Sequence, residues 1–313
     1  MSTAETMRGS IKSTDAQILA PTAPQVSLDF AAEIASNSGR RQDVPVRTLF
    51  VRDFAAAGDA PLARLVATGG RGGGVAIKLY LALLWRCSAP PFDTAISARK
   101  WAALLGLDDP THRGARRITD ALRTLQSQGL IALTTNRGEA SIIQLREESG
   151  RAEYTLPSDA YVRETDAAKK QERTYFKVPT ALWTKGHIQS LSTPALAMLL
   201  ICLSSNGANG KQVWWSTRVF PEQYGLSPAT RARGTTELVK RRLMLVDKQL
   251  VPETPGRTRD FTREKVRNLY TLVGAARLSD LAPRKAIKSK PKKAVKRGPR
   301  RHAAPNKSAA TTA

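Results

Sequence analysis

The feature that most constrains the fold is a repeated order of predicted elements. Each of two apolar-rich blocks, 45–148 and 173–275, contains a strongly apolar helix, a short amphipathic segment, a third helix and a basic hairpin. Residue identity between the two blocks is low, so the shared order of elements is the evidence for the repeat. A chain of 313 residues is long enough to form two such domains.

The junction between third helix and hairpin is clearest in residues 118–145. Ile118, Leu122 and Leu125 recur at helical spacing, and Gly129 ends the pattern. The residues that follow alternate like two short strands around a Thr-Asn-Arg-Gly turn. Glycine adopts the left-handed backbone that a tight reversal needs, so we expect the helix to turn directly into a hairpin there.

Three further segments lie outside the two blocks. Residues 1–44 are rich in Ser, Thr and Ala and lack periodicity apart from a short helix at 28–36, which predicts a mostly disordered N-terminal region. The polar stretch 149–172 is predicted to be a linker. Residues 276–313 are predicted to be a basic disordered tail, because proline blocks regular structure and like charges repel. The predicted fold class is mainly α with short β-hairpins, an α+β arrangement of two domains between two tails.

The charge of the chain indicates its partner. Fifty Lys and Arg against 26 Asp and Glu give a formal net charge of +24, which is typical of proteins that bind nucleic acid. Residues 284–313 hold eleven Lys or Arg and no acid, which leaves +13 of the +24 on the rest of the chain. The tail is expected to add phosphate attraction that does not depend on DNA sequence.

The repeated order of helices and hairpin resembles the winged helix-turn-helix family. Its tandem occurrence in one chain is similar to the replication initiators of plasmids and phages. The resemblance implies that each third helix enters a DNA major groove, while the hairpin, or wing, lies along an adjacent groove or the backbone. It also implies that one chain reads two neighbouring groove segments of a repeat in a replication origin. A transcriptional repressor, a nucleoid packaging protein and a winged-helix scaffold for protein interactions remain as alternatives.

Helical geometry assigns the exposed side of each third helix. In the first block the apolar stripe leaves a basic, acidic, basic series on the opposite side, and in the second block Leu238 and Val239 are predicted to face inward while Glu237 faces out. Arginine can bind guanine or phosphate, and an acid can accept from cytosine or fix an arginine rotamer. The alternative is a solvated face of surface ion pairs. The predicted DNA-binding residues are Arg113, Arg116, Arg117, Asp120, Arg123, Asn136, Arg137, Thr230, Arg233, Thr236, Lys240, Arg257, Arg259 and Arg263.

Two adjacent tryptophans precede the short helix of the second block. Trp214 and Trp215 offer ring faces on which bases can stack, but large aromatic side chains more often pack in a core. We therefore expect at least one of the two to be a core residue.

Catalytic and metal sites are not predicted. The glycine-rich stretch 69–78 lacks the Gly-Lys-Ser/Thr ending of a phosphate-binding loop, and the histidines are far apart in sequence. Cys87 and Cys202 are predicted to be buried thiols in a reducing compartment. No apolar run reaches the about 18 residues of a membrane span. We expect a bacterial cytoplasmic, nucleoid-associated protein that is not an enzyme and needs no cofactor. Its expected partner is double-stranded DNA, and a homodimer or replication-machinery partners remain open.

Overall fold

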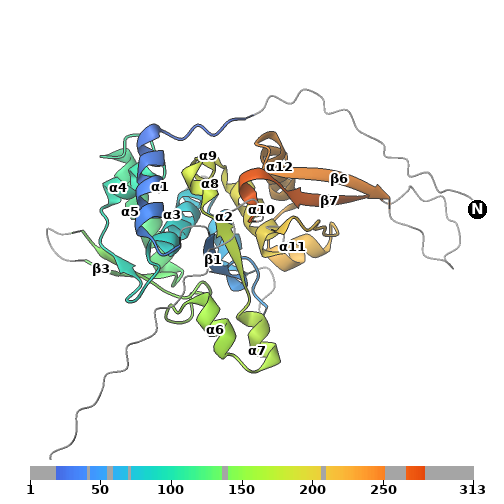
Figure 1. Ribbon diagram of the computed structural model, residues 1–313, viewed down its shortest axis with the longest axis horizontal. Coiled ribbons are helices and arrows are strands. Elements are labelled where there is room, and N and C mark those ends of the chain that lie inside the picture. Colours follow the sequence, from blue (N-terminus) through green and yellow to red (C-terminus); the bar gives the residue numbers. More distant parts are fainter. Residues whose placement is uncertain are drawn as a thin grey trace, which may run out of the picture. The chain divides into compact units, whose positions relative to one another are not determined.

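The computed structural model describes residues 19–40, 43–54, 59–69, 72–135, 140–205, 209–250 and 266–278. In these ranges the fold is mixed α and β, with helices predominating over three small antiparallel sheets (Figure 1). The α+β class predicted from the sequence is confirmed at this level. The described ranges contain no helix that is both long and apolar enough to cross a membrane.

The first block contains the order of helices and hairpin that its sequence predicts. Its elements are strand β1 (Asp43–Arg47), the 3-10 turn η1 (Thr48–Phe50), helices α2 (Pro61–Ala67) and α3 (Gly73–Arg86), strand β2 (Asp93–Thr94), helices α4 (Ala98–Leu104) and α5 (Arg113–Ser127), and strands β3 (Ile131–Thr134) and β4 (Ile142–Leu145). The sheet order is β2-β4-β3, so the hairpin is attached to the body through β2.

The second block repeats this order. Its elements are strand β5 (Tyr175–Pro179), helices α8 (Ala181–Thr184), α9 (His187–Ser190), α10 (Thr193–Ser204), α11 (Val219–Tyr224) and α12 (Pro228–Lys240), strands β6 (Met244–Leu250) and β7 (Val266–Leu272), and the 3-10 turn η4 (Gly274–Ala276). An isolated bridge between Val213 and Tyr270 takes the place that β2 has in the first block. The hairpins β3–β4 and β6–β7 therefore each have a third segment paired to their second strand.

The first strands of the two blocks pair with each other. β1 and β5 are antiparallel, with Val44 opposite Val178 and Val46 opposite Phe176, and all four side chains are buried. The rings of Trp85 in α3 and Trp183 in α8 stack across the same junction, with their centroids 5.7 Å apart. The two blocks thus share a sheet and a core, and the predicted domain boundaries stay a prediction.

The most apolar helix of each block forms the centre of the core. In α10 every side chain from Ala195 to Leu203 is buried, and α3 is buried on nearly all sides. A helix that is hydrophobic all round is stable only inside a protein. α5 packs on α3 and α12 packs on α10. A Cβ atom at Gly234 would lie 2.3 Å from the carbonyl oxygen of Pro194, so only glycine permits the observed approach of α12 to α10.

The N-terminal region predicted as disordered includes an ordered helix. Helix α1 (Gln25–Asn37) contains the short helix expected at 28–36 and packs against α4 and α8. Ala31 and Ile34 are buried in the core, and the Ser27 hydroxyl donates to the carbonyl of Leu104. This helix is the exception that the sequence analysis made to the predicted disorder, and its burial was not predicted. Residues 1–18 and 279–313, which include most of the predicted basic tail, lie outside the described residues.

The predicted linker 149–172 contains two short helices, α6 (Pro157–Arg163) and α7 (Ala167–Glu172). Its first residues are attached to the first block, because Tyr154 is buried and Thr155 accepts hydrogen bonds from Arg47 at 2.8 Å. Gly129 and Gly150 meet where the chain leaves α5. Both have positive φ, and a Cβ at Gly129 would lie 2.4 Å from the Gly150 carbonyl oxygen. The tight reversal predicted at Gly129 is confirmed.

Candidate nucleic-acid interface

The third helix of the first block, α5, has the predicted division into a buried and an exposed side. Ile118, Leu122 and Leu125 are buried, as expected. The turn before the helix is held by Asp109, whose carboxylate accepts from the backbone N–H groups of His112 and Arg113 at 3.3 Å. These and neighbouring hydrogen bonds, the one from the Arg113 backbone above all, lower the pKa of Asp109 to about 2. The predicted residues Arg113, Arg116, Arg117, Asp120 and Arg123 are all exposed.

The exposed arginines of α5 differ in their partners. Arg113 pairs with Asp109 at 3.7 Å, and Arg123 pairs with Asp120 at 3.0 Å. Arg116 and Arg117 form no ion pair within the described part of the chain. The guanidinium groups of Arg116 and Arg117 can therefore bind an anionic ligand without first giving up a carboxylate partner, whereas Arg113 and Arg123 must exchange a weak ion pair.

The third helix of the second block, α12, departs from the predicted division at two positions. Its start follows local rules, since the Ser227 hydroxyl accepts from the backbone of Thr230 at 3.1 Å and Pro228 is the first helical residue. Leu238 is buried as predicted. Val239 was predicted to face inward, but 39% of its surface is exposed. The packed stripe of α12 runs through Gly234 and Leu238 instead, which turns Val239 toward solvent.

Glu237 was predicted to face outward between two basic residues, and this prediction is wrong. Its carboxylate accepts from the backbone N–H of Ser192 at 3.1 Å and from the Ser192 hydroxyl, and it pairs with Arg241 at 3.0 Å. Arg241 in turn donates to the carbonyl oxygens of Ser190 and Ala20. Glu237 therefore attaches α12 to the start of α10 and is not part of an exposed basic, acidic, basic series.

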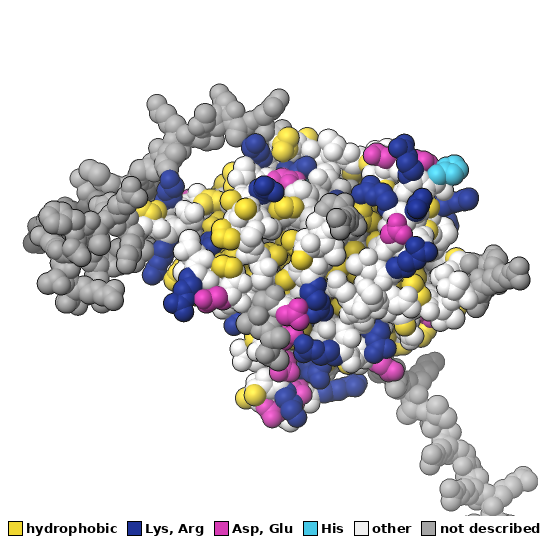
Figure 2. Space-filling view, turned by 180° about the vertical axis from the view of Figure 1, so that it is seen from behind, with side chains coloured by type: hydrophobic (Ala, Val, Ile, Leu, Met, Phe, Trp, Pro, Cys, Tyr) yellow, Lys and Arg dark blue, Asp and Glu magenta, His cyan; other side chains and the backbone are white. Residues whose placement is uncertain are grey.

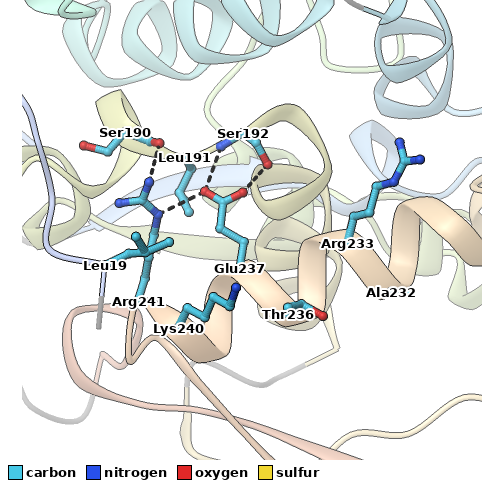
Figure 3. Close-up of a pocket in the computed structure, with 10 residues that line it drawn as sticks. All are labelled: Leu19, Ser190, Leu191, Ser192, Ala232, Arg233, Thr236, Glu237, Lys240 and Arg241. Carbon is cyan, nitrogen blue, oxygen red and sulfur yellow. Dashed lines mark hydrogen bonds and ion pairs between the residues drawn. The ribbon is translucent and has the colours of Figure 1, made fainter. Parts of the chain in front are cut away.

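An open hollow of about 680 Å³ lies beside α12 (Figure 3). It is lined by Arg233, Thr236 and Lys240 on the helix, by residues 190–192, and by Leu19, whose N–H donates to the carbonyl of Lys240 at 3.1 Å. Figure 3 shows Glu237 linked to both Ser192 and Arg241, whereas the side chains of Arg233 and Lys240 have no partner among the residues drawn. In the described ranges these two cations form no ion pair at all. Thr230 is half-buried at the start of the same helix.

The third helices of the two blocks border one region of the surface. Lys78 in α3 donates to the carbonyl of Gln189 at 2.8 Å. Burial above all lowers the pKa of Lys78 to about 8; Glu237 opposes this shift, and the guanidinium groups of Arg117 in α5 and of Arg241, which follows α12, add to it. Both third helices thus bring a guanidinium near the same ammonium.

The number of Lys and Arg side chains on the surface does not by itself locate the candidate nucleic-acid interface. Figure 2 shows Lys and Arg side chains spread over one face of the molecule, many of them beside Asp or Glu. The Lys and Arg side chains of α5 and α12 that lack a carboxylate partner indicate the candidate interface more selectively.

The predicted wing residues follow the first strand of each hairpin in the sequence. Asn136, Arg137, Arg257, Arg259 and Arg263 are outside the described residues, so their assignment remains a prediction. The described part of the second hairpin contributes Arg267, whose guanidinium carbon lies 4.0 Å from the ring centroid of Trp214.

Arg231 is a residue whose role the sequence interpretation missed. It donates to the carbonyl of Trp215 at 3.1 Å and to the hydroxyl of Tyr270 at 2.9 Å, and its guanidinium lies over the ring of Phe220. It therefore connects α12 to α11 and β7. Its spacing to Gly234 and Leu238 is that of one helix side, which is the signal that could have placed it in the packed stripe. Trp215 packs in this cluster, which confirms the expectation for one of the two tryptophans.

The described ranges contain no group of three or more His, Cys, Asp or Glu able to hold a metal. Cys87 and Cys202 are buried free thiols, as predicted, and burial raises the pKa of Cys87 to about 12. No family model matches the chain, and comparisons with curated proteins and with solved structures find no match either. Function is therefore inferred from the residues themselves.

The burial of Lys78 predicts a specific pH dependence of stability. Its pKa is lower in the folded chain than the ordinary value, so the unfolded chain binds more protons between about pH 8 and 10.5, and stability should rise with pH in that window. Lys78→Met should remove this rise and stabilise the protein near pH 7 by on the order of 1 kcal/mol. Urea unfolding at pH 7.5 and 9.5 measures both effects. Lys100→Met, at an exposed position of α4, is the control, and an equal slope in Lys78→Met and the unmodified chain would contradict the assignment.

Proposed function

We propose that the chain binds a specific double-stranded DNA site through two winged-helix units. In this proposal α5 and α12 enter neighbouring major grooves, and the hairpins β3–β4 and β6–β7 act as wings along the backbone. The observation that carries it is the pair of exposed cations without a carboxylate partner on each third helix: Arg116 and Arg117 on α5, and Arg233 and Lys240 on α12, within the described residues.

The order of elements supports the assignment. Each block has an apolar helix, a short helix, a third helix and a hairpin, and in each hairpin the second strand also pairs with the segment before the short helix. This is the order of a winged helix-turn-helix, in which the third helix is the one that enters the groove. The packing of α5 and α12 through their apolar sides leaves their basic sides exposed.

The predicted residues divide into two roles. Arg116 and Arg233 lie on the exposed sides of their helices and are assigned to base edges, where a guanidinium can bind guanine with two hydrogen bonds. Lys240 and Thr236 line the hollow beside α12 and are assigned to a backbone phosphate. Arg117, which has no carboxylate partner in the described ranges, is assigned to attraction of the DNA backbone beside α5.

The exposed sides of α5 and α12 differ, so one chain can read two different groove segments within one site. Tandem winged-helix replication initiators read the repeats of an origin in this way, and we propose a similar origin-binding role. A transcriptional repressor is the alternative within DNA binding. Footprinting on the DNA that flanks the gene distinguishes them, because repeated sites favour the initiator and a single site over a promoter favours the repressor.

The proposal is tested by selecting duplexes from a random library with the full chain. The selected duplex and a scrambled version are then titrated at fixed salt, with the full chain and with a chain that ends at residue 283. We expect both chains to prefer the selected duplex by about 10³-fold or more. The shorter chain lacks the eleven Lys and Arg of 284–313, so it should bind more weakly and with a shallower salt dependence. No enrichment, or a preference confined to the full chain, would count against two specific units. Binding to protein partners but not to bare DNA would favour the scaffold.

A further inference from the structure

The segment that pairs with β7 through the Val213–Tyr270 bridge carries an aromatic residue that is not part of the core. Trp214 is 45% exposed, although its neighbour Trp215 is packed among Phe220, Tyr224 and Tyr270. The guanidinium carbon of Arg267 lies 4.0 Å from the Trp214 ring centroid. Exposing so large an apolar ring to water is unfavourable, so an exposed tryptophan layered with an arginine is a candidate binding surface.

Strand pairing places these two residues on the outward face of the sheet. Val213 is bridged to Tyr270, and both are buried, so the next residue, Trp214, points to the opposite face. Arg267 is three residues before Tyr270 on β7 and shares that outward face. The stacking of Arg267 on Trp214 agrees with this arrangement.

The outward face around Trp214 mixes polar and apolar side chains. Directly opposed strand residues share a face, so it holds Asp247, Gln249 and Thr271 together with Leu245 and Leu269. Gln212 reaches the same face, since its side-chain amide donates to Asp247 at 3.3 Å. Tryptophan and arginine are also enriched in protein docking sites, so a protein partner is the other occupant that the test below has to distinguish. The composition fits a ligand that is flat, aromatic and attached to anions.

The charge of the hairpin agrees with an anionic ligand. Residues 244–272 hold six Lys or Arg and four Asp or Glu. Arg267 forms no ion pair with a carboxylate in the ranges that the structure describes, so its charge is available.

We propose that Trp214 and Arg267 form a stacking platform for an unpaired base of single-stranded DNA. Bases in a duplex are stacked on one another and cannot reach such a platform, whereas an unpaired base has a free face. The Arg267 guanidinium stacks on Trp214 and attracts a phosphate next to the bound base. The platform is distinct from the exposed sides of α5 and α12, and it does not depend on the duplex binding proposed for them.

The test compares an oligothymidylate of about 16 nucleotides with an abasic strand of the same length. Both strands carry the same phosphates, so attraction by the basic tail is equal and only base stacking differs. The full chain is titrated by fluorescence anisotropy. We expect it to prefer the strand with bases by about five- to a hundredfold, and Trp214→Ala to lose that preference while its binding to the abasic strand is unchanged. Trp214→Phe, which keeps a ring, should retain most of the preference.

A charge-matched pair separates stacking from electrostatics. Lys248 is opposite Asn268 and lies on the other face of the same hairpin, so Lys248→Ala should weaken both strands equally. Arg267→Ala should in addition reduce the preference for bases. Circular dichroism and duplex titration, both expected to be unchanged in Trp214→Ala, show that the fold and the third helices are intact. A preference that persists in Trp214→Ala overturns the proposal. So does a change in self-association of Trp214→Ala without a change in base preference, because that result would assign the face to protein docking.

Discussion

Glu148→Ala is expected to destabilise the protein by about 3–5 kcal/mol, the cost of leaving a buried charge without its partner. The side chains of Glu148 and Arg47 are both fully buried and form an ion pair, and the Glu148 carboxylate also accepts from the Arg47 backbone at 3.2 Å. Burial alone would lower the pKa of Arg47, but the carboxylates of Glu148 and Glu147 raise it, so the guanidinium stays charged. In the variant this buried charge would keep only the more distant carboxylate of Glu147, at 3.6 Å, which Arg173 also binds.

The location of the Arg47–Glu148 pair explains why its loss should destabilise the whole fold. Arg47 ends β1, the strand that joins the two blocks, and its second guanidinium nitrogen donates to the carbonyl and hydroxyl oxygens of Thr155 at 2.8 Å. Glu147 connects the cluster to Arg173 at 2.7 Å, just before β5. The cluster therefore holds both strands of the shared sheet and the start of the predicted linker.

Urea unfolding monitored by circular dichroism measures the effect. The double variant Arg47→Met, Glu148→Leu should lose less stability than Glu148→Ala, because both members of the pair are removed together and the buried Glu147 keeps its ion pair with Arg173. Glu222→Ala breaks the exposed Arg218–Glu222 pair and should change stability by less than about 1 kcal/mol. A Glu148→Ala variant as stable as Glu222→Ala would show that Arg47 reaches water or another partner in solution.

The sequence predicts local order well because that order depends on local periodicity. The apolar stripe of Ile118, Leu122 and Leu125 and the reversal at Gly129 follow from spacing and backbone freedom, and both are confirmed. Helix α1 was placed correctly, but its burial was missed, since that burial depends on α4 and α8, which lie far along the chain.

The errors in α12 have a related cause. This helix packs through Gly234 and Leu238, with Arg231 and Glu237 making polar contacts to neighbouring elements, so the hydrophobic pattern is a weak guide to its buried side. The pairing of β1 with β5 and the buried Arg47–Glu148 pair join residues about a hundred or more positions apart, and no local pattern predicts them. The structure is also needed to tell which arginine and lysine side chains of the candidate interface have no ion-pair partner. In the sequence Arg113 and Arg116 are equivalent, whereas in the structure one is paired and the other is not.

The difference between paired and free arginines yields the second prediction with a large expected effect. Arg116→Ala and Arg233→Ala should each weaken binding to the selected duplex by about 1–3 kcal/mol and relax preference at one or two base pairs. The two residues lie on separate third helices, so the losses should add in the double variant to about 2–6 kcal/mol. Arg113→Ala is the matched control on α5, because Arg113 is already paired with Asp109 and should matter less.

The measurement is a titration against a panel of single-base variants of the selected duplex at fixed salt, after circular dichroism has shown each variant to be folded. A loss that is equal for every duplex means that Arg116 and Arg233 contact only phosphates, and base reading must then come from other residues. If Arg113→Ala costs as much as Arg116→Ala, the ion pair with Asp109 does not decide which arginine is available. If neither Arg116→Ala nor Arg233→Ala weakens binding, the third helices are solvated faces and the proposed interface is wrong. If only one of the two variants weakens binding to the selected duplex, only the block with that residue reads DNA bases, and the other block has a different partner.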